Sequence, residues 1–325
     1  MIHLPRSLKL MALSWVMASG LAHAQNAQSY PNRPVKIVVP FAAGGPADNY
    51  ARFMAQRLTD ELKQSFVIDN KPGAGSIIGT DFAAKSPADG YTLLMMSNTQ
   101  TVNESLIPKK PFALMKDFVG IAPVNYSNLL LVVHPSVPAK NVSELIALAK
   151  SKPGKLNYAS SGNGTPYHMA GELFKYMAGV DMTHVPYKGS SGARTDIVGG
   201  QVDVMFDAET TMAEFARNGQ VRMLGATGLT RSANLPDVST VAETVPKYEA
   251  TIWLGFMAPK GTPADIVTKL NAEMRKIVNN PDVKTAWAKQ GAVPLSMTVA
   301  EFEQYLNADI AKWANIVKVS GAKAD

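Results

Sequence analysis

The sequence predicts an α/β protein of two lobes, each a mostly parallel sheet flanked by helices, with a ligand cleft between the lobes. Three observations lead to this fold class. Short β-branched runs alternate with helical patterns early in the chain, which is the rhythm of a parallel sheet covered by helices. The same rhythm returns in residues 128–250, and the last third is mostly helical. A chain of 325 residues, 46 % of them hydrophobic, suffices for two ordinary domains.

The first α/β unit opens on "PVKIVV", a short apolar run after a proline that indicates a buried strand. The expected strands of this unit cover residues 34–39, 65–69 and 91–96, with a helix over about 49–62 and a short helix before the Asp89-Gly90 turn. We expect the unit and the returning C-terminal segment to form the first lobe, residues 25–127 plus 251–325.

The second α/β unit is expected to form the second lobe, residues 128–250. Its predicted strands are 128–135, 156–160, 182–187, 202–206 and 221–227, and its predicted helices are 143–152, 166–178, about 191–199, and 209–218. Pockets favour the interfaces between such units and the C-terminal ends of parallel strands.

Three helix starts are predicted in the last third. Thr262 is expected to cap a helix whose first residue is Pro263, and Asn280 with Pro281 repeats that arrangement. Thr298, followed three residues later by a glutamate, predicts a capping box that opens the last helix.

The N-terminus is typical of a secretory signal, residues 1–24. Arg6 and Lys9 precede an apolar run that is too short for a membrane anchor, and Ala22-His23-Ala24 is a small-x-small cleavage site. We predict cleavage after Ala24 and an exported protein, with an uncleaved anchor as the alternative. The net charge of +6 is spread without basic runs, so no nucleic-acid partner is expected. The chain has no cysteine, which excludes disulfides and thiol chemistry.

A glycine loop after the first strand is the first candidate site. The strand ends at Gly44-Gly45, where the backbone can approach a ligand, and a helix N-terminus that favours an anion follows. The spacings of a Walker loop and of a dinucleotide fingerprint are both missing, so a carboxylate fits better than a nucleotide. A plain tight turn fits the same residues.

A second loop repeats this arrangement in the second unit. Its Ser160, Ser161, Asn163 and Thr165 supply hydroxyl and amide groups, and Thr165 is followed by a proline that starts a helix. Two such loops, one in each lobe, could hold one anion from both sides. Alternatively, the loop only caps its helix.

Three further side chains allow two interpretations each. His168 either contacts a ligand or is an ordinary residue of a first helical turn. Asp207, at the end of an apolar strand, either faces the cleft or caps the next helix. Trp253 either walls a pocket or lies in the core. His134 and His184 lie in or beside expected strands and are interpreted as structural.

Enzyme chemistry receives little support. The Gly-x-Ser-x-Gly motif is missing, which leaves a secreted hydrolase acting through Ser161 and His168 as the less favoured alternative. The sequence contains no His-x-x-x-His pair and no EF-hand spacing, so neither a metal site nor a cofactor is expected.

Four segments together resemble a known family. These are "YPNRPVKIVVPFAAGGPAD" (30–48), "NKPGAGSIIGTDFAAKSPADGYTLL" (70–94), the long stretch 158–207, and "FMAPKGTP" (256–263). In them the chain resembles the solute receptors of tripartite tricarboxylate transporters, the Bug or TctC-like family of bacteria. The resemblance implies a type II-like periplasmic binding protein that is not an enzyme and that closes on a small organic carboxylate. It also implies a monomer that delivers this ligand to a membrane permease; a receptor that feeds a membrane sensor is the alternative.

The resemblance also implies where the ligand lies. In the family, backbone N–H groups at two opposed helix N-termini hold one carboxylate, which corresponds here to the loops 41–48 and 160–168. Asp48 and Asp207 match family aspartates. Pro46, the segment 96–106 and the segment 165–168 depart from the family pattern, so the ligand's identity is not carried over. The expected ligand-binding residues are Phe41, Ala42, Gly44, Gly45, Asp48, Ser97, Thr99, Asn103, Ser160, Ser161, Gly162, Asn163, Gly164, Thr165, His168, Tyr187 and Asp207.

Overall fold

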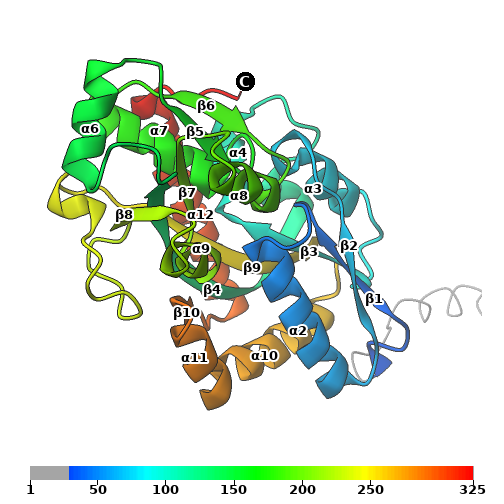
Figure 1. Cartoon of the computed structure of the whole chain (residues 1–325). Helices are drawn as coiled ribbons and strands as arrows, with labels where there is room; N and C mark the ends of the chain where they lie inside the picture. The colour runs from blue at the N-terminus through cyan, green and yellow to red at the C-terminus, as the bar shows by residue number, and fades with distance from the viewer. Residues whose placement is uncertain (1–28, 325) are drawn as a thin grey trace, which may run out of the picture.

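The computed structural model describes residues 29–324 and contains two lobes built on one continuous sheet (Figure 1). The predicted signal peptide and its cleavage site lie outside the described residues. The strand order is β2-β1-β3-β9-β4-β7-β5-β6, and β8 and β10 both pair with β4. Among the residues described, no helix is both long and apolar enough to cross a bilayer.

The first lobe carries the predicted parallel strands. β1 (Val35–Val39) lies between β2 (Phe66–Asn70) and β3 (Thr92–Ser97), and it is parallel to both. Each strand leads into a helix or a helical turn, as expected for this unit. The helices of this part are α2 (Pro46–Leu62), α3 (Ile77–Ala84), α4 (Asn98–Leu106) and α5 (Leu114–Asp117), with a 3₁₀ turn η2 (Ala74–Ser76). α2 begins at Pro46, three residues before the predicted start, because proline suits the first helical position.

β4 (Phe118–Val133) belongs to both lobes. It pairs antiparallel with β9 (Thr251–Pro259) as far as Asn128, and from Leu129 onward with β7 and β8. The prediction placed this strand at 128–135 and was wrong about its start. Register shifts lie between Gly120 and Ala122 and between Pro123 and Asn125. A strand accommodates proline at such an irregularity, but in the sequence the proline interrupts the strand pattern, so this half of β4 was not predicted.

The second lobe repeats the parallel pattern beyond β4. β5 (Asn157–Ser160) pairs in parallel with β6 (Thr183–Pro186) and β7 (Val204–Ala208), while β8 (Arg222–Ala226) is antiparallel to β4. The whole sheet is therefore mixed: the parallel pairs predicted for each lobe are joined through antiparallel strands. The helices are α6 (Val142–Ser151), α7 (Pro166–Ala178), α8 (Ser190–Val198) and α9 (Glu209–Arg217), followed by the 3₁₀ turn η3 (Val241–Glu243).

The chain then returns to the first lobe. Its elements are β9, α10 (Ala264–Asn279), α11 (Pro281–Ala288), β10 (Ala292–Pro294) and α12 (Val299–Ser320). The caps predicted at Asn280 and Thr298 are confirmed by side-chain hydrogen bonds to helix N–H groups. The cap predicted at Thr262 is wrong, because its hydroxyl donates to the Pro259 carbonyl and the helix begins at Ala264.

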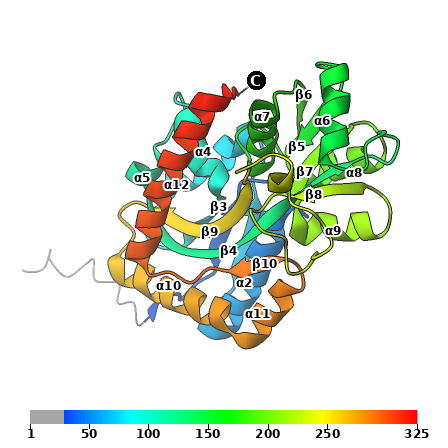
Figure 2. The same ribbon diagram turned by 90° about the vertical axis from the view of Figure 1, so that its left-hand side faces the viewer.

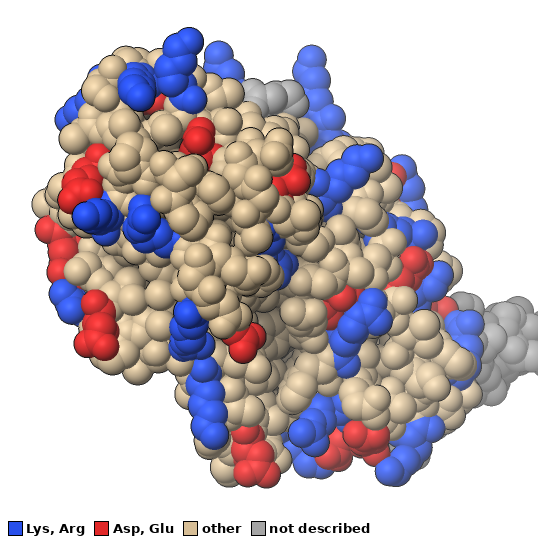
Figure 3. Space-filling model, in the orientation of Figure 1, with Lys and Arg blue, Asp and Glu red and all other residues tan. Residues whose placement is uncertain are grey.

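α12 packs against both lobes. It lies beside α4 of the first lobe (Figure 2) and also contacts α7 of the second. An apolar cluster joins the three helices through Val102 of α4, Met169 of α7 and Trp313 of α12. Charged side chains of both signs are interspersed over the face shown in Figure 3.

Candidate functional site

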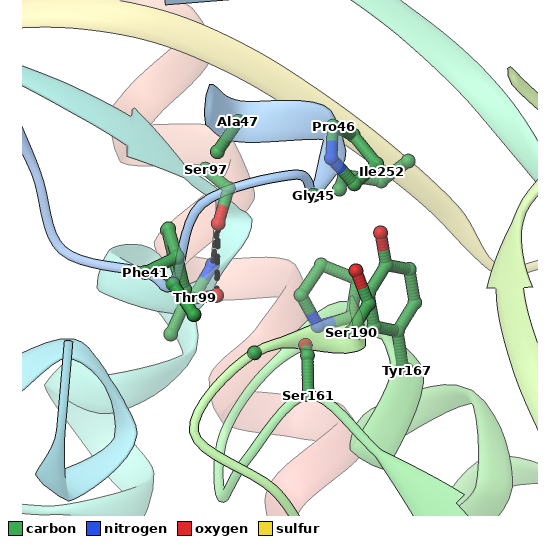
Figure 4. A pocket seen from close by; sticks show the side chains of 13 residues that line it. Phe41, Gly45, Pro46, Ala47, Ser97, Thr99, Ser161, Tyr167, Ser190 and Ile252 are labelled. Atoms are coloured by element: carbon green, nitrogen blue, oxygen red, sulfur yellow. Dashed lines mark hydrogen bonds between the residues drawn. The ribbon is translucent and has the colours of Figure 1, made fainter. Parts of the chain in front are cut away.

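Four helix N-termini meet at a pocket between the lobes. α2 and α4 approach it from the first lobe, and α7 and α8 from the second (Figure 4). Helix N-termini carry unpaired N–H groups and a partial positive charge, so their convergence favours an anion. The pocket is lined by Phe41, Ala42, Gly45, Pro46, Ala47, Ser97, Thr99, Ser161, Pro166, Tyr167, Gly189, Ser190 and Ile252.

None of the thirteen side chains lining the pocket is charged. Its polar groups are the hydroxyls of Ser97, Thr99, Ser161, Tyr167 and Ser190. The Tyr167 hydroxyl is directed toward Pro46 and Ile252 (Figure 4). Hydroxyls and backbone N–H groups can hydrogen-bond a carboxylate without a cation in the lining.

The loop 41–48 is held by Asp48 rather than presenting it to the pocket. Gly44, whose φ of 80° suits glycine, donates its N–H to Asp48 Oδ2 at 3.0 Å. The same carboxylate accepts from Arg52 Nε at 2.9 Å and from Asn70 Nδ2 at 3.0 Å. Burial alone would raise the pKa of Asp48, but these hydrogen bonds and the Arg52 charge outweigh it and lower the pKa.

The loop 160–168 is held by neutral groups. Thr165 caps α7 by accepting from the His168 N–H, and its hydroxyl donates to the Gly162 carbonyl at 2.7 Å. The Ser160 hydroxyl accepts from the Gly162 N–H at 3.1 Å and lies 2.6 Å from His184 Nε2. Ser160 is therefore buried behind the loop, and Ser161 lines the pocket.

His168 lies behind the loop as a neutral acceptor. Its Nδ1 accepts from the Gly164 N–H at 3.1 Å, and its ring stacks on His184 with centroids 4.1 Å apart. Burial, with smaller contributions from His184 and Lys175, lowers the pKa of His168 to about 3. A buried imidazole whose Nδ1 is occupied by a backbone N–H is a poor general base for Ser161.

Asp207 lies beneath the pocket and outside its lining. Its Oδ1 accepts from the Ala208 N–H at 2.8 Å, and its Oδ2 lies 3.2 Å from Arg194 Nε. Burial raises the pKa of Asp207 to about 6, against the opposing charge of Arg194. Oδ1 thus accepts a hydrogen bond from the backbone, and Oδ2 is paired with the charge of Arg194 but accepts no hydrogen bond.

The other predicted side chains are distributed around the pocket. Ser97 and Thr99 line it and hydrogen-bond each other in the capping box of α4. Asn103 lies outside the lining and donates to the Gly75 carbonyl at 2.9 Å. Tyr187 lines an adjoining cavity that shares Phe41 and Ser161 with the pocket and that also contains Gly162 and Asn163. The Tyr187 hydroxyl donates to Asp196, and burial followed by this bond raises its pKa to about 12. Trp253 lies in the core, where it donates to Asp309.

Sequence reasoning missed the contribution of α8 and of β9. Gly189 and Ser190 line the pocket at the start of α8, and Ile252 reaches it from β9. The signal for α8 was present, since "KGSSGAR" again places glycine and serine before a helix, but it was tested only as a nucleophile motif. Ile252 lies in an apolar strand and gives no local signal.

The two lobes are in direct contact across the pocket. The Ala42 N–H donates to the Lys188 carbonyl at 3.3 Å, and Arg194 Nη2 donates to the Gly44 carbonyl at 3.0 Å. Residues 29–324 contain no group of three or more histidine, aspartate or glutamate side chains arranged to hold a metal ion.

Comparison with known proteins gives one family. The model of the tripartite tricarboxylate transporter family receptor matches residues 50–322. Protein BugT of Bordetella pertussis is 36 % identical over 312 residues, covering 95 % of this chain and 96 % of that protein. The solved structure of R. palustris Rpa4515 with adipate has a TM-score of 0.88 at 34 % identity and covers 90 % of this chain and 99 % of that one. MatC (Rpa3494) from Rhodopseudomonas palustris with bound malate has a TM-score of 0.84 at 32 % identity, with coverage of 89 % and 100 %.

Proposed function

The chain belongs to the tripartite tricarboxylate transporter receptor family, and we propose that it binds a small organic carboxylate between its lobes. Members of this family are periplasmic solute receptors and not enzymes. The observation that carries the proposal is the convergence of four helix N-termini on a pocket without charged side chains. In such a pocket, N–H groups and hydroxyls from both lobes can hydrogen-bond a carboxylate and stabilise its negative charge.

Binding and closure are coupled in this proposal. Donors of the first lobe, at Gly45 and Ala47, and donors of the second, at Tyr167 and Ser190, reach one ligand only when the lobes are together. A ligand then shifts the population to the closed form by its differential affinity for that form. Of the predicted site residues, Phe41, Ala42, Gly45, Ser97, Thr99 and Ser161 are proposed to contact the ligand, and the others to shape the loops.

We infer further that the ligand carries no amino group. A buried ammonium group needs an acceptor of opposite charge. None lines the pocket, Asp48 already accepts from Gly44, Arg52 and Asn70, and Asp207 is already paired with the charge of Arg194. Adipate and malate, which are bound by the two similar receptors, both lack an amino group.

Delivery to a membrane permease is proposed from the family's description. A receptor that feeds a membrane sensor is the second candidate, and the genes beside this one distinguish the two. We propose that the receptor acts as a monomer. The lobe limits 25–127 plus 251–325 and 128–250 remain a proposal, supported by the change of β4 partner after Asn128 and by the start of β9 at Thr251.

A thermal-shift screen of the chain from Gln25 tests the proposed ligand class. The panel contains dicarboxylates, hydroxy acids, aromatic acids and amino acids, each with its amide as the control. At 100 times its dissociation constant, a ligand stabilises the fold by ~2.7 kcal/mol, which is a shift of a few degrees. We expect an acid without an amino group to raise the melting temperature and its amide to have no effect. A panel that stays without effect after unfolding and refolding the protein would contradict the proposal.

A further inference from the structure

Arg194 is a buried cation that spans the two lobes next to the pocket without lining it. It lies on α8, and only 7 % of its surface is exposed. Its Nη2 donates to the Gly44 carbonyl of the first lobe at 3.0 Å, across 150 residues of sequence. A guanidinium group at such a position forms a charge-assisted hydrogen bond with little competition from water.

The second lobe fixes the position of this guanidinium. Nε lies 3.2 Å from Asp207 Oδ2 and also donates to the Ser190 carbonyl at 3.3 Å. Nη2 donates to Ser190 Oγ at 3.0 Å as well as to Gly44. Because these partners belong to β7 and α8, the guanidinium keeps its place when the lobes separate, and only the bond to Gly44 is lost.

The bond to Gly44 also orients a peptide group at the pocket wall. Within the first lobe, Asp48 holds the Gly44 N–H. Arg194 holds the Gly44 carbonyl from the other side. Because a peptide group is planar and trans, fixing this carbonyl also fixes the N–H of Gly45, which lines the pocket and caps α2.

We propose that Arg194 is a positioning residue that sets ligand affinity without touching the ligand, by fastening the Gly44-Gly45 peptide across the closed cleft. The inference rests on the proposed function. The apparent dissociation constant of such a receptor equals the intrinsic constant divided by the fraction of molecules in the binding-competent form. Removing the bond lowers that fraction, so adipate, malate and other acids that bind between the lobes all lose affinity. The loss falls on the dissociation rate, because a ligand leaves when the lobes open.

The test uses a variant that avoids an unpaired buried charge. Arg194→Met alone would leave Asp207 without its counter-ion, which is strongly destabilising, so the variant is Arg194→Met with Asp207→Asn. Arg194→Lys keeps the charge beside Asp207 but has a single donor group in place of the fork that spans both lobes. The matched control is Arg222→Met, since Arg222 donates to the carbonyls of Pro135, Val137 and Ala139 within the second lobe.

Dissociation rates and affinities are measured with adipate and malate as probes. We expect dissociation from the double variant to be about tenfold faster or more, with Arg194→Lys intermediate and Arg222→Met unchanged apart from a lower melting temperature. Ser161→Ala, which alters the pocket lining, should change the adipate-to-malate affinity ratio by more than the Arg194 variants do. Unchanged dissociation rates in the Arg194 variants would overturn the inference.

A second measurement needs no ligand. The chain has no cysteine, so Gln56→Cys and Asn218→Cys can carry a fluorescent pair, one label on α2 and one after α9. The double Arg194 variant should shift the label distance of the unliganded protein toward the open form, and Arg222→Met should not. If no acid binds but the distance shifts, the proposed ligand class fails while the lobe-fastening role stands. If neither the distance nor the dissociation rate changes, the role of Arg194 is rejected.

Discussion

The loops 41–48 and 160–168 resemble each other in sequence but are held by different chemistry. In the first, the charged Asp48 accepts from Gly44, Arg52 and Asn70. In the second, the neutral groups of Ser160, Thr165 and His168 hold the backbone, and His184 stacks behind them. The uncharged loop is therefore more sensitive to mild acid than the loop that contains the aspartate. Its histidine must lose a hydrogen bond to take up a proton, whereas the aspartate stays ionised to lower pH.

The largest expected effect is that of an alanine substitution at a glycine of positive φ, because the space around that glycine differs between the two loops. A Cβ at Gly164 would lie 2.2 Å from Asn103 Oδ1 of the first lobe, whereas a Cβ at Gly44 meets no atom within 4 Å. Gly164→Ala should therefore cost the closed form ~1–3 kcal/mol by overpacking, or about ten- to a hundredfold in ligand affinity, beyond its backbone strain. Gly44→Ala should cost only backbone strain, ~1–2 kcal/mol of folding stability in the open and the closed form alike, and should leave the affinity nearly unchanged. Titration calorimetry with the screened acid measures the affinity of both variants, and equal losses would show that the clash is relieved elsewhere.

The next effect is the acid sensitivity of the second loop. A histidine has an unfolded-state pKa near 6.5, and the pKa of folded His168 is lowered to about 3. The unfolded chain therefore binds the extra proton, and stability that is complete above pH 6.5 falls by ~1 kcal/mol per pH unit between 6.5 and about 3. Urea unfolding between pH 7.5 and 4 measures this slope.

Two variants show whether the slope belongs to His168. His168→Asn places an amide oxygen near the Gly164 N–H and removes the titration, so its stability should depend less on pH. His134→Gln is the control, at a partly exposed histidine that hydrogen-bonds its near neighbour Ser136. An unchanged slope in His168→Asn would assign the acid sensitivity to another group.

The smallest effect concerns the first loop. Because hydrogen bonds from protein groups lower the pKa of Asp48, its contribution is present above the unfolded value near 3.9 and is lost as the pH falls through the lower folded value. Asp48→Asn should lose about 1 kcal/mol at pH 7, because the Arg52 partner is half exposed and screened. The difference from wild type should persist at pH 5 and shrink below pH 4 in urea titrations. A difference that does not shrink below pH 4 would mean that the pKa of Asp48 is not lowered in the folded protein.

Local signals explain which parts of the fold could be predicted. The helix predicted at 166–178 has these bounds in the structure, since Thr165 and Pro166 start it and Gly179 in a left-handed conformation ends it. The first half of β4 could not be read from the sequence, because Pro123 and the register shifts interrupt its pattern. Thr262 carried a capping signal but used its hydroxyl on the preceding strand end.

The candidate site divides in the same way. Residues of both predicted glycine loops line the pocket, and the loops could be recognised in the sequence because strand, glycine and helix start are neighbours in the chain. Arg194 was missed because its partners, Gly44 and Asp207, are brought to it only by the folding of both lobes. The sequence-based prediction put the Asp207 side chain in the cleft, whereas in the structure it pairs with Arg194 outside the pocket lining. The position of Asp207 at a strand end does not reveal that a buried arginine lies beside it.

The shared strand β4 has a mechanical consequence. Its ladder passes from β9 to β7 and β8 between Asn128 and Leu129 without a break in the strand. Rotation of one lobe against the other therefore changes the twist of β4. A β-strand has an intrinsic right-handed twist, and departure from this twist costs energy. We therefore expect the twist of β4 to favour one relative orientation of the two lobes and to oppose rotation away from it in either direction.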